Sequence, residues 1–235
     1  MIERLIPTAS TYAADIDSVF NLVFILVGFW FVLTEGLFLW LILRFRKRDG
    51  VAAEYISGEL KSEKRWISIP HLLVLVCDVF IIVAAVRVWY DVKQSLPPAQ
   101  ATIRVIGQQW AWSFEHPGPD GELGTADDIR TVDDLHVEVN KLYHFELVSR
   151  DVLHSFSVPV FRLKQDVIPG RVITGWFQPT LTGSYDIQCA EICGIGHALM
   201  PGRIVVETPE QHTAWMASQS PLSVAALDSP RAAQE

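Results

Sequence analysis

Apolar residues in this chain fall into two long runs near its N-terminal end, followed by many short runs. Residues 19–43 contain a single ionisable side chain, Glu35. Residues 67–90 are apolar apart from three residues, His71, Asp78 and Arg87. Each run is long enough to cross a lipid bilayer as a helix, and aromatic residues flank the second run as they do at membrane interfaces. The pattern predicts a membrane-embedded pair of helices over 19–43 and 67–90.

Beyond residue 95 the pattern changes to short runs typical of strands. Val, Ile, Phe, Tyr and Thr dominate these runs, and Gly, Pro or Asp separates them, which favours an all-β sandwich or barrel. The predicted strands are 101–106, 109–115, 135–139, 143–149, 155–160, 171–178, 183–188 and 202–207. The predicted domains are a membrane anchor over 1–95, a β domain over 96–217 and a flexible tail over 218–235.

Basic residues gather in the connection between the two apolar runs, at Arg44, Arg46, Lys47, Arg48, Lys61, Lys64 and Arg65. The positive-inside rule places such a connection in the cytoplasm, so both termini and the β domain are expected on the outer face. Residues 1–18 lack the basic start of an ordinary cleavable signal peptide. The predicted location is the bacterial inner membrane, with the β domain on the periplasmic side.

Ionisable groups inside the apolar runs are expensive in lipid, so we expect Glu35, Asp78 and Arg87 to face a partner subunit or one another. A structural pairing of an acid with Arg87 is favoured over a transport role, because Arg87 is near the interface and can extend its charge into it. Cys77, in the second run, is expected to be a buried and inert thiol. With three cysteines, the chain has no disulfide framework.

Candidate metal chemistry is concentrated between Cys189 and Met200, in the segment Cys-Ala-Glu-Ile-Cys-Gly-Ile-Gly-His-Ala-Leu-Met. Two thiols, an imidazole and a thioether suit copper, whereas zinc would accept the thiols and the imidazole but has no use for Met. The same spacing could line one face of a helix, or the two cysteines could form a disulfide. Glycines at 194 and 196, Pro201 and strand-like flanks favour a loop between two strands.

The motif Cys-x-Glu-x-Cys-x-x-x-His-x-x-Met resembles the binuclear copper (Cu-A) loop of the cytochrome c oxidase subunit II family. The resemblance extends to Asp-Val-Leu-His-Ser-Phe-Ser-Val-Pro at 151–159, Leu-Lys-Gln-Asp-Val-Ile-Pro-Gly-Arg at 163–171 and Gly-Gln-Gln-Trp-Ala-Trp at 107–112. It also includes the two membrane segments. The family implies a cupredoxin-like Greek-key sandwich for the β domain.

The resemblance implies a complete ligand set for two copper ions. Cys189 and Cys193 would bridge both ions, His154 and Met200 would complete one, and His197 with the backbone carbonyl of Glu191 would complete the other. His154 lies 35 residues before Cys189 on a predicted strand. Taken alone, it would more often be a core histidine. The sequence does not name the hydrogen-bond acceptors expected for the two imidazoles.

Further residues take roles from the same resemblance. The carboxylate of Glu191 would bind magnesium at the border with the catalytic subunit, unless it only forms a hydrogen bond with a neighbour. Trp110 would be the point where electrons enter, and Trp112 is expected on the same strand face, although core packing is the commoner fate of Trp. Ala111 departs from the aromatic residue that the family more often has there. Glu63 would stand at the mouth of a proton-uptake path, or be a solvated charge.

Turn residues and six acids occupy the segment 116–134, and the chain as a whole carries a formal net charge of −8. That balance speaks against a nucleic-acid partner and suits a basic protein. The carboxylates of Asp120, Glu122, Asp127 and Asp128 could hold calcium, although their spacing does not fit an EF-hand. A solvated loop, or one that steers a basic cytochrome c, are the alternatives.

The predicted function is electron transfer in a haem–copper terminal oxidase, from cytochrome c to a catalytic subunit that reduces oxygen. The chain would catalyse nothing alone and would act as a subunit of the enzyme. A nitric oxide reductase of the same superfamily is the alternative, because of the acidic insert and Glu35. A copper-free quinol oxidase subunit is less favoured, since all the copper ligands are present.

Overall fold

A computed structural model describes residues 5–52 and 55–219 and divides the chain into two compact units. A helical unit lies within residues 15–91, and a β unit combines residues 5–14 with residues 92–219. Of the predicted tail over 218–235, the part from residue 220 lies outside the described residues.

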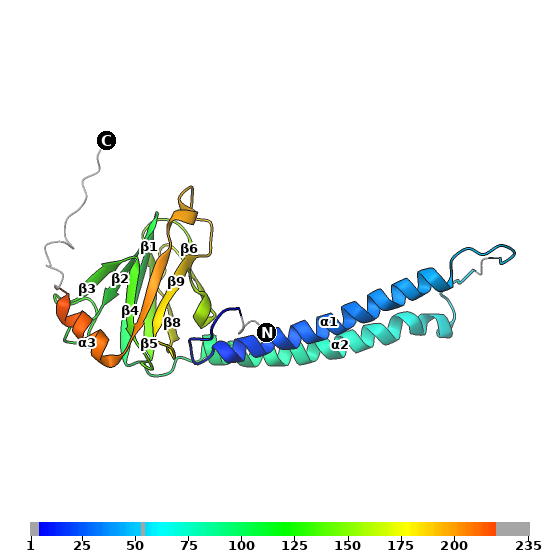
Figure 1. Ribbon diagram of the computed structural model, residues 1–235, viewed down its shortest axis with the longest axis horizontal. Coiled ribbons are helices and arrows are strands. Elements are labelled where there is room, and N and C mark those ends of the chain that lie inside the picture. Colours follow the sequence, from blue (N-terminus) through cyan, green and yellow to red (C-terminus); the bar gives the residue numbers. More distant parts are fainter. Residues whose placement is uncertain (1–4, 53–54, 220–235) are drawn as a thin grey trace. The chain divides into compact units, whose positions relative to one another are not determined.

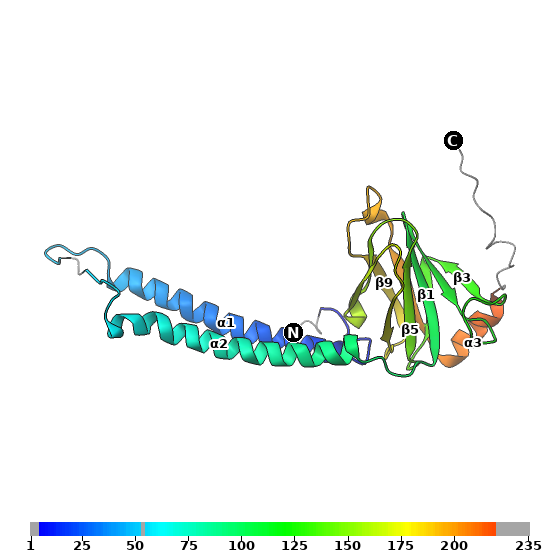
Figure 2. The same cartoon turned by 180° about the vertical axis from the view of Figure 1, so that it is seen from behind.

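The helical unit consists of α1 (Ala13–Arg44) and α2 (Lys61–Trp89), and a short π-helical segment, Tyr90–Gln94, follows α2. The two helices run side by side in opposite directions (Figures 1 and 2). Both are long and apolar enough to cross a membrane, and their most apolar stretches are not buried within the protein. Each begins six residues before its predicted start, because the polar residues ahead of the apolar run already belong to the first helical turns. The chain is therefore membrane-anchored.

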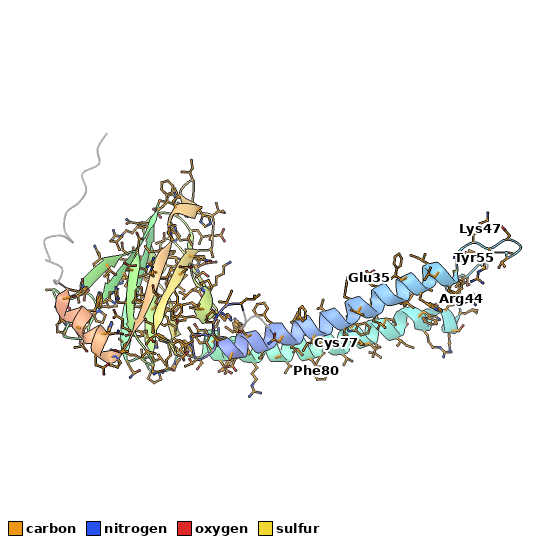
Figure 3. The ribbon with its side chains drawn as sticks, in the orientation of Figure 1. Glu35, Arg44, Lys47, Tyr55, Cys77 and Phe80 are labelled. Atoms are coloured by element: carbon orange, nitrogen blue, oxygen red, sulfur yellow. The ribbon has the colours of Figure 1, made fainter. Side chains whose placement is uncertain are left out.

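The intramembrane ionisable residues do not pair as expected. Among the described residues, neither Glu35 nor Asp78 forms an ion pair or hydrogen bond, and Arg87 has no acidic partner. Arg87 follows Asp78 by nine residues, which separates them by about 13 Å along a helix axis. Cys77 is only partly buried, and its sulfur accepts a hydrogen bond of 3.4 Å from the Trp30 indole N–H. Figure 3 marks Glu35 and Cys77 along the two helices.

The β unit is a sandwich of two five-stranded sheets with strand orders β3-β2-β1-β5-β8 and β4-β10-β9-β6-β7. The strands are β1 (Ala101–Gln108), β2 (Ala111–His116), β3 (Ile129–Val132), β4 (Asp134–Glu138), β5 (Tyr143–Ser149), β6 (His154–Val158), β7 (Leu163–Val167), β8 (Ile173–Phe177), β9 (Gly183–Cys189) and β10 (Gly202–Glu207). β1 pairs with β5 and β10 with β4 in parallel, and the other pairs are antiparallel. This non-sequential order gives the Greek-key, cupredoxin-like sandwich that was predicted.

Alternation of buried and less buried positions explains why these strands form a sandwich. In β5 every second residue is buried, which directs Phe145 and Leu147 between the sheets. Trp112 from β2 packs edge-to-face on Phe156 from β6, so the two sheets meet through aromatic rings. The result is a rigid, apolar scaffold that fixes the ends of β6 and β9, where the candidate ligands begin.

Three elements were missing from the sequence prediction. β3 and β7 are short and carry polar residues, so neither shows an apolar alternation, and both are fixed by pairing with β2 and β6. Helix α3 (Pro209–Ser218) begins with a capping box in which the Thr208 hydroxyl accepts from the Gln211 N–H. Thr-Pro-Glu-Gln is a helix-start signal that the sequence did contain.

Trp215 holds α3 against the sandwich through two histidines, His136 of β4 and His116 of β2, and also stacks on His212 of its own helix. Its ring stacks on His136 at 4.3 Å and on His212 at 5.4 Å, and it meets His116 edge-on at 5.0 Å. The Glu207 carboxylate accepts from His136 at 2.8 Å and from His212 at 3.0 Å. His116 is buried, and its Nε2 has no hydrogen-bond partner among the described residues.

Because His116 is buried, we expect the β unit to lose stability in mild acid. Burial, reinforced by nearby His212 and His136, lowers the pKa of His116 from 6.5 to about 3. Below pH 6.5 the unfolded chain takes up a proton that the folded chain refuses, so this contribution is full above 6.5 and is lost progressively as pH falls towards 3. Within that window the cost approaches about 1.4 kcal/mol per pH unit.

Amide hydrogen exchange in β1 and β2 of the detergent-solubilised chain, followed from pH 7 to 4.5, measures this effect. His116→Gln removes the ionisable group, so its stability should depend less steeply on pH than that of the unchanged chain. Equal pH slopes for the two proteins would show that His116 does not carry the acid sensitivity.

Candidate metal centre

The loop between β9 and β10 presents most of the candidate ligands at one end of the sandwich. Cys189 is the last residue of β9, and Met200 lies two residues before β10. Between them a single 3-10 turn, η4 (His197–Leu199), returns the chain. Because β9 and β10 are antiparallel neighbours, the two ends of the loop are held together by strand pairing. The loop is not the core helix that its residue spacing also allowed.

Two glycines let this loop pack against residues 109 and 110. A Cβ at Gly196 would lie 2.3 Å from Cδ2 of Trp110, which leaves no room for a side chain. Gly194 has a φ of +119°, and a Cβ there would lie 2.8 Å from Nε2 of Gln109. That backbone conformation favours glycine. The two glycines that argued against a helix, Gly194 and Gly196, are thus the positions where the loop packs against Gln109 and Trp110.

The structure brings the candidate sulfur and nitrogen donors together. The two thiol sulfurs, Cys189 Sγ and Cys193 Sγ, are 3.8 Å apart and form no disulfide. Nδ1 of His154 lies 3.9 Å from Cys189 Sγ, although the two residues come from β6 and β9. On the other side, Nδ1 of His197 is 3.6 Å and Sδ of Met200 is 3.3 Å from Cys193 Sγ. The two cysteines therefore stand at the middle of the group.

Glu191 contributes its backbone to the same group. Its carbonyl oxygen lies 3.3 Å from Cys189 Sγ. Among the described residues, His154, Cys189 and Cys193 form the only set of three His, Cys, Asp or Glu ligand atoms close enough to share an ion. Thiols, imidazoles, a thioether and a carbonyl make a donor set that fits copper, and the thioether has no role at a zinc site.

The candidate ligand side chains are shielded from solvent, whereas apolar side chains of the same loop are exposed. His154, Cys193 and Met200 are at most 3% exposed, whereas Ile192, Ile195 and Leu199 are at least 75% exposed. Burial, helped by the neighbouring Cys189, raises the pKa of the Cys193 thiol to about 11. A metal ion that binds here must displace that proton.

Asp151 orients His154 and is a residue that sequence reasoning missed. Its Oδ1 accepts from Nε2 of His154 at 2.8 Å, which leaves Nδ1 of that ring facing Cys189. Burial alone would raise the pKa of Asp151, but hydrogen bonds from His154 and from the Gln109 and Val152 N–H groups hold it below its ordinary value. Such a carboxylate behind a ligating imidazole fixes the tautomer and the ring orientation. The only sequence signal was an acid three residues before the histidine.

Gln109 and Trp110 connect the segment around Asp151 and His154 to the loop that carries Cys193. The Gln109 N–H donates to Oδ2 of Asp151 at 2.6 Å, and its side-chain amide donates to the Cys193 carbonyl at 2.7 Å. Nε1 of Trp110 lies 3.4 Å from the same carbonyl. Trp110 is 39% exposed, and it lies in the turn between β1 and β2. Trp112 is fully buried inside the sandwich, so the two rings do not share a strand face as expected.

Other residues singled out from the sequence lie outside this group. Glu63 caps the first turn of α2, where its carboxylate accepts from the Leu60 N–H at 3.2 Å and from the Ser57 hydroxyl at 3.3 Å. In the acidic segment 116–134, the carboxylates accept hydrogen bonds from backbone N–H groups of the same loop. Asp127 accepts from the Asp120 N–H, Asp120 from the Glu122 N–H and Asp128 from the Gly124 N–H.

A helical hairpin long enough to span a membrane, followed by a cupredoxin-like sandwich with a sulfur-rich loop, defines a class of membrane-anchored β domain with a candidate metal centre. Residues 101–208 match the family model described as cytochrome c oxidase subunit II, periplasmic domain. The alternative cytochrome c oxidase subunit 2 of Bradyrhizobium diazoefficiens is 33% identical, over 87% of this chain and 80% of that protein. Cytochrome c oxidase subunit 2 of Cereibacter sphaeroides is 28% identical, over 89% and 78% respectively.

The chain belongs to the cytochrome c oxidase subunit II family. It is similar to the crystal structure of the periplasmic domain of subunit II of cytochrome oxidase from Bradyrhizobium japonicum, with 30% identity and a TM-score of 0.48 over 53% of this chain and 96% of that chain. The relatives named above are subunits of cytochrome c oxidase complexes.

Proposed function

We propose that the β unit holds a binuclear Cu-A centre and relays electrons from cytochrome c to the catalytic subunit. The observation that carries this is the convergence of His154 from β6 with the two thiols, His197 and Met200 from the β9–β10 loop. When bound, the copper pair would supply a one-electron redox centre whose charge is shared between two metals through the bridging thiolates.

The chain's own residues would prepare this centre before metal arrives. Cys189 and Cys193 would bridge, His154 with Met200 would complete one metal site, and His197 with the Glu191 carbonyl would complete the other. Asp151 would keep His154 in one tautomer, because its carboxylate accepts from Nε2. Burial of Cys193 and Met200 would exclude water, and the rigid sandwich would hold the ligands in fixed positions.

Assay of the intact complex tests this function and separates it from the alternative. The proposed subunit predicts oxygen consumption that depends on reduced cytochrome c and disappears when copper is removed. Nitric oxide consumption without oxygen consumption would favour the nitric oxide reductase instead. The relatives named above are all cytochrome c oxidase subunits, so they give that alternative no support. A copper-free quinol oxidase subunit is disfavoured by the convergent donors.

We propose that electrons enter at Trp110, since its ring is partly exposed and its indole N–H contacts the Cys193 carbonyl. Replacing Trp110 with Gln should slow reduction by cytochrome c about tenfold, equivalent to about 1.4 kcal/mol in the barrier. Stopped-flow reduction of the complex measures this rate. Trp110→Phe keeps an aromatic ring and should retain more of the rate, and the copper spectrum should stay unchanged in both. Equal rates for unchanged protein and Trp110→Gln would remove this role.

The acidic segment is proposed to steer a basic donor rather than to bind calcium. Its carboxylates accept hydrogen bonds from their own loop, and among the described residues they do not gather within reach of one ion. Exposed Asp120 and Glu122 leave negative charge at the surface, which raises the association rate with a basic cytochrome c at low salt.

Two further roles rest on family resemblance and stay proposals. The Glu191 side chain would bind magnesium at the border with the catalytic subunit. Glu63 would open a proton-uptake path, in addition to capping α2. The proposed domains are an anchor over 1–95, a β domain over 96–217 and a tail over 218–235. We propose that the subunit lies in the inner membrane with its copper domain facing the periplasm.

A further inference from the structure

Two carboxylates lie within the apolar parts of the membrane helices, one on each helix. Glu35 stands on α1 and Asp78 on α2, both far from the polar helix ends (Figure 3 labels Glu35). Acids at such depth are rare in membrane helices, and those that occur face a bundle interior or a partner group. Between residues 18 and 43 and between 66 and 86 the chain has no Lys or Arg. The two acids therefore have no Lys or Arg of this chain at their own depth, and the one histidine in these two ranges is His71 on α2.

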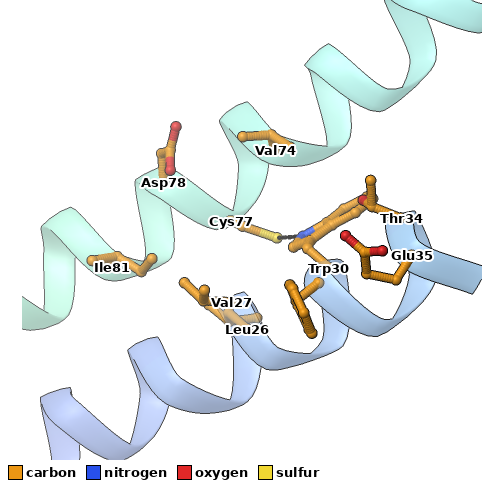
Figure 4. A pocket seen from close by; sticks show the side chains of 10 residues that line it. Leu26, Val27, Trp30, Thr34, Glu35, Val74, Cys77, Asp78 and Ile81 are labelled. Atoms are coloured by element: carbon orange, nitrogen blue, oxygen red, sulfur yellow. Dashed lines mark hydrogen bonds between the residues drawn. The ribbon is translucent and has the colours of Figure 1, made fainter. Parts of the chain in front are cut away.

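Both carboxylates line a single pocket between α1 and α2, with a volume of about 380 Å³ (Figure 4). The rest of its lining is mostly apolar, and the Thr34 hydroxyl adds one further oxygen. Figure 4 shows the two acids extending from different helices without pointing at each other. Neither has a hydrogen-bond or ion-pair partner in the part of the chain that the structure describes.

A contact between the helices shapes this pocket. The Trp30 indole N–H on α1 donates to Sγ of Cys77 on α2 at 3.4 Å, and both residues line the pocket. The indole is thereby satisfied within the hairpin and is not available to either carboxylate. The acids remain as two acceptors of the pocket without a partner among the described residues, and a charged group left unpaired in lipid is unfavourable.

We propose that the pocket between Glu35 and Asp78 receives a basic side chain from a transmembrane helix of the partner oxidase subunit. Charge complementarity carries the assignment, because two acids line the pocket and no basic residue of this chain does, His71 included. A free metal cation fits less well, since a hard cation needs six or more oxygen ligands and the pocket is mostly apolar. The proposal rests on the assembly of this chain with a catalytic subunit, and it identifies the face that the partner occupies.

Affinity purification of the tagged chain from membranes, with haem measured per chain, tests the proposal. Glu35→Gln together with Asp78→Asn should lower the copurified haem by about tenfold or more, because removing one side of a buried ion pair strands the other charge in lipid. Asp91→Asn is the matched control, since it removes an acid beyond the end of α2 and should keep haem at the unchanged level. Unaltered haem in the double variant, with copper intact, would overturn the proposal while the copper function stands. If the unchanged chain copurifies no haem protein, the proposed assembly fails as well.

A second measurement decides the matter if the double variant does not insert into the membrane. A hydrophobic carbodiimide modifies protonated carboxyl groups in lipid. In membranes that lack the other subunits, Glu35 and Asp78 should be modified, as mass spectrometry of the peptides would show. In the assembled oxidase the partner's basic side chain should occupy the pocket and protect both carboxyl groups by at least about tenfold. Equal modification in both membranes would contradict the proposal.

Discussion

Replacing Cys193 with Ser is expected to abolish the binuclear centre. Its sulfur lies within 3.8 Å of donors from Cys189, His197 and Met200, so its removal takes away a donor at the middle of the group. The loss in copper affinity should exceed the about 10–100-fold that removal of an outer-shell partner costs. Electron transfer from cytochrome c should fall with it. Copper content and the visible spectrum of the purified chain measure the result.

Cys77→Ser is the matched control for this substitution, because it makes the same chemical change in the helical unit. It should leave copper content and spectrum unaltered, since a hydroxyl can still accept the Trp30 N–H. A Cys193→Ser protein that keeps two coppers and an unchanged spectrum would show that the thiols do not bridge.

Asp151→Asn should weaken copper binding by about 10–100-fold while leaving all the ligands in place. An amide can donate to Nε2 of His154 instead of accepting from it, so the ring can adopt the tautomer that carries its proton on Nδ1. That nitrogen faces Cys189 Sγ at 3.9 Å and must be free of a proton to bind metal. Competition with a copper chelator measures the affinity.

The control for Asp151→Asn is Asp186→Asn, an identical change of charge at an exposed position on β9. It should alter copper affinity little. If Asp151→Asn and Asp186→Asn bind copper with similar affinity, Asp151 acts only through its charge or does not act on His154. A selective loss in Asp151→Asn would assign it the positioning of the imidazole.

The parts of the fold that could be predicted were those with a strong local pattern. Strands such as β5 and β10 carry their own signal, because burial of one face makes apolar residues recur at every second position. The two apolar runs carry one as well, because a helix that crosses a membrane needs about 20 apolar residues. β3 and β7 could not be predicted, since their polar residues are ordered by pairing with neighbouring strands. Helix α3 had a capping signal but little amphipathic pattern, and its position depends on Trp215 against distant histidines.

The candidate site shows the same division. The loop from Cys189 to Met200 is local in sequence, so its donors could be read directly, and the family resemblance supplied His154. What the sequence could not supply is the geometry that makes the donors work. Asp151 is recognisable only once β6 places His154 against Cys189, and the exposure of Trp110 depends on a turn that alternation had assigned to a strand.

Metal analysis of the purified chain, combined with electron paramagnetic resonance, tests the central claim most directly. We predict two copper ions per chain and, in the mixed-valence state, one unpaired electron shared equally by both ions in a purple protein. A single copper with its electron localised on one nucleus, or zinc in place of copper, would contradict the account.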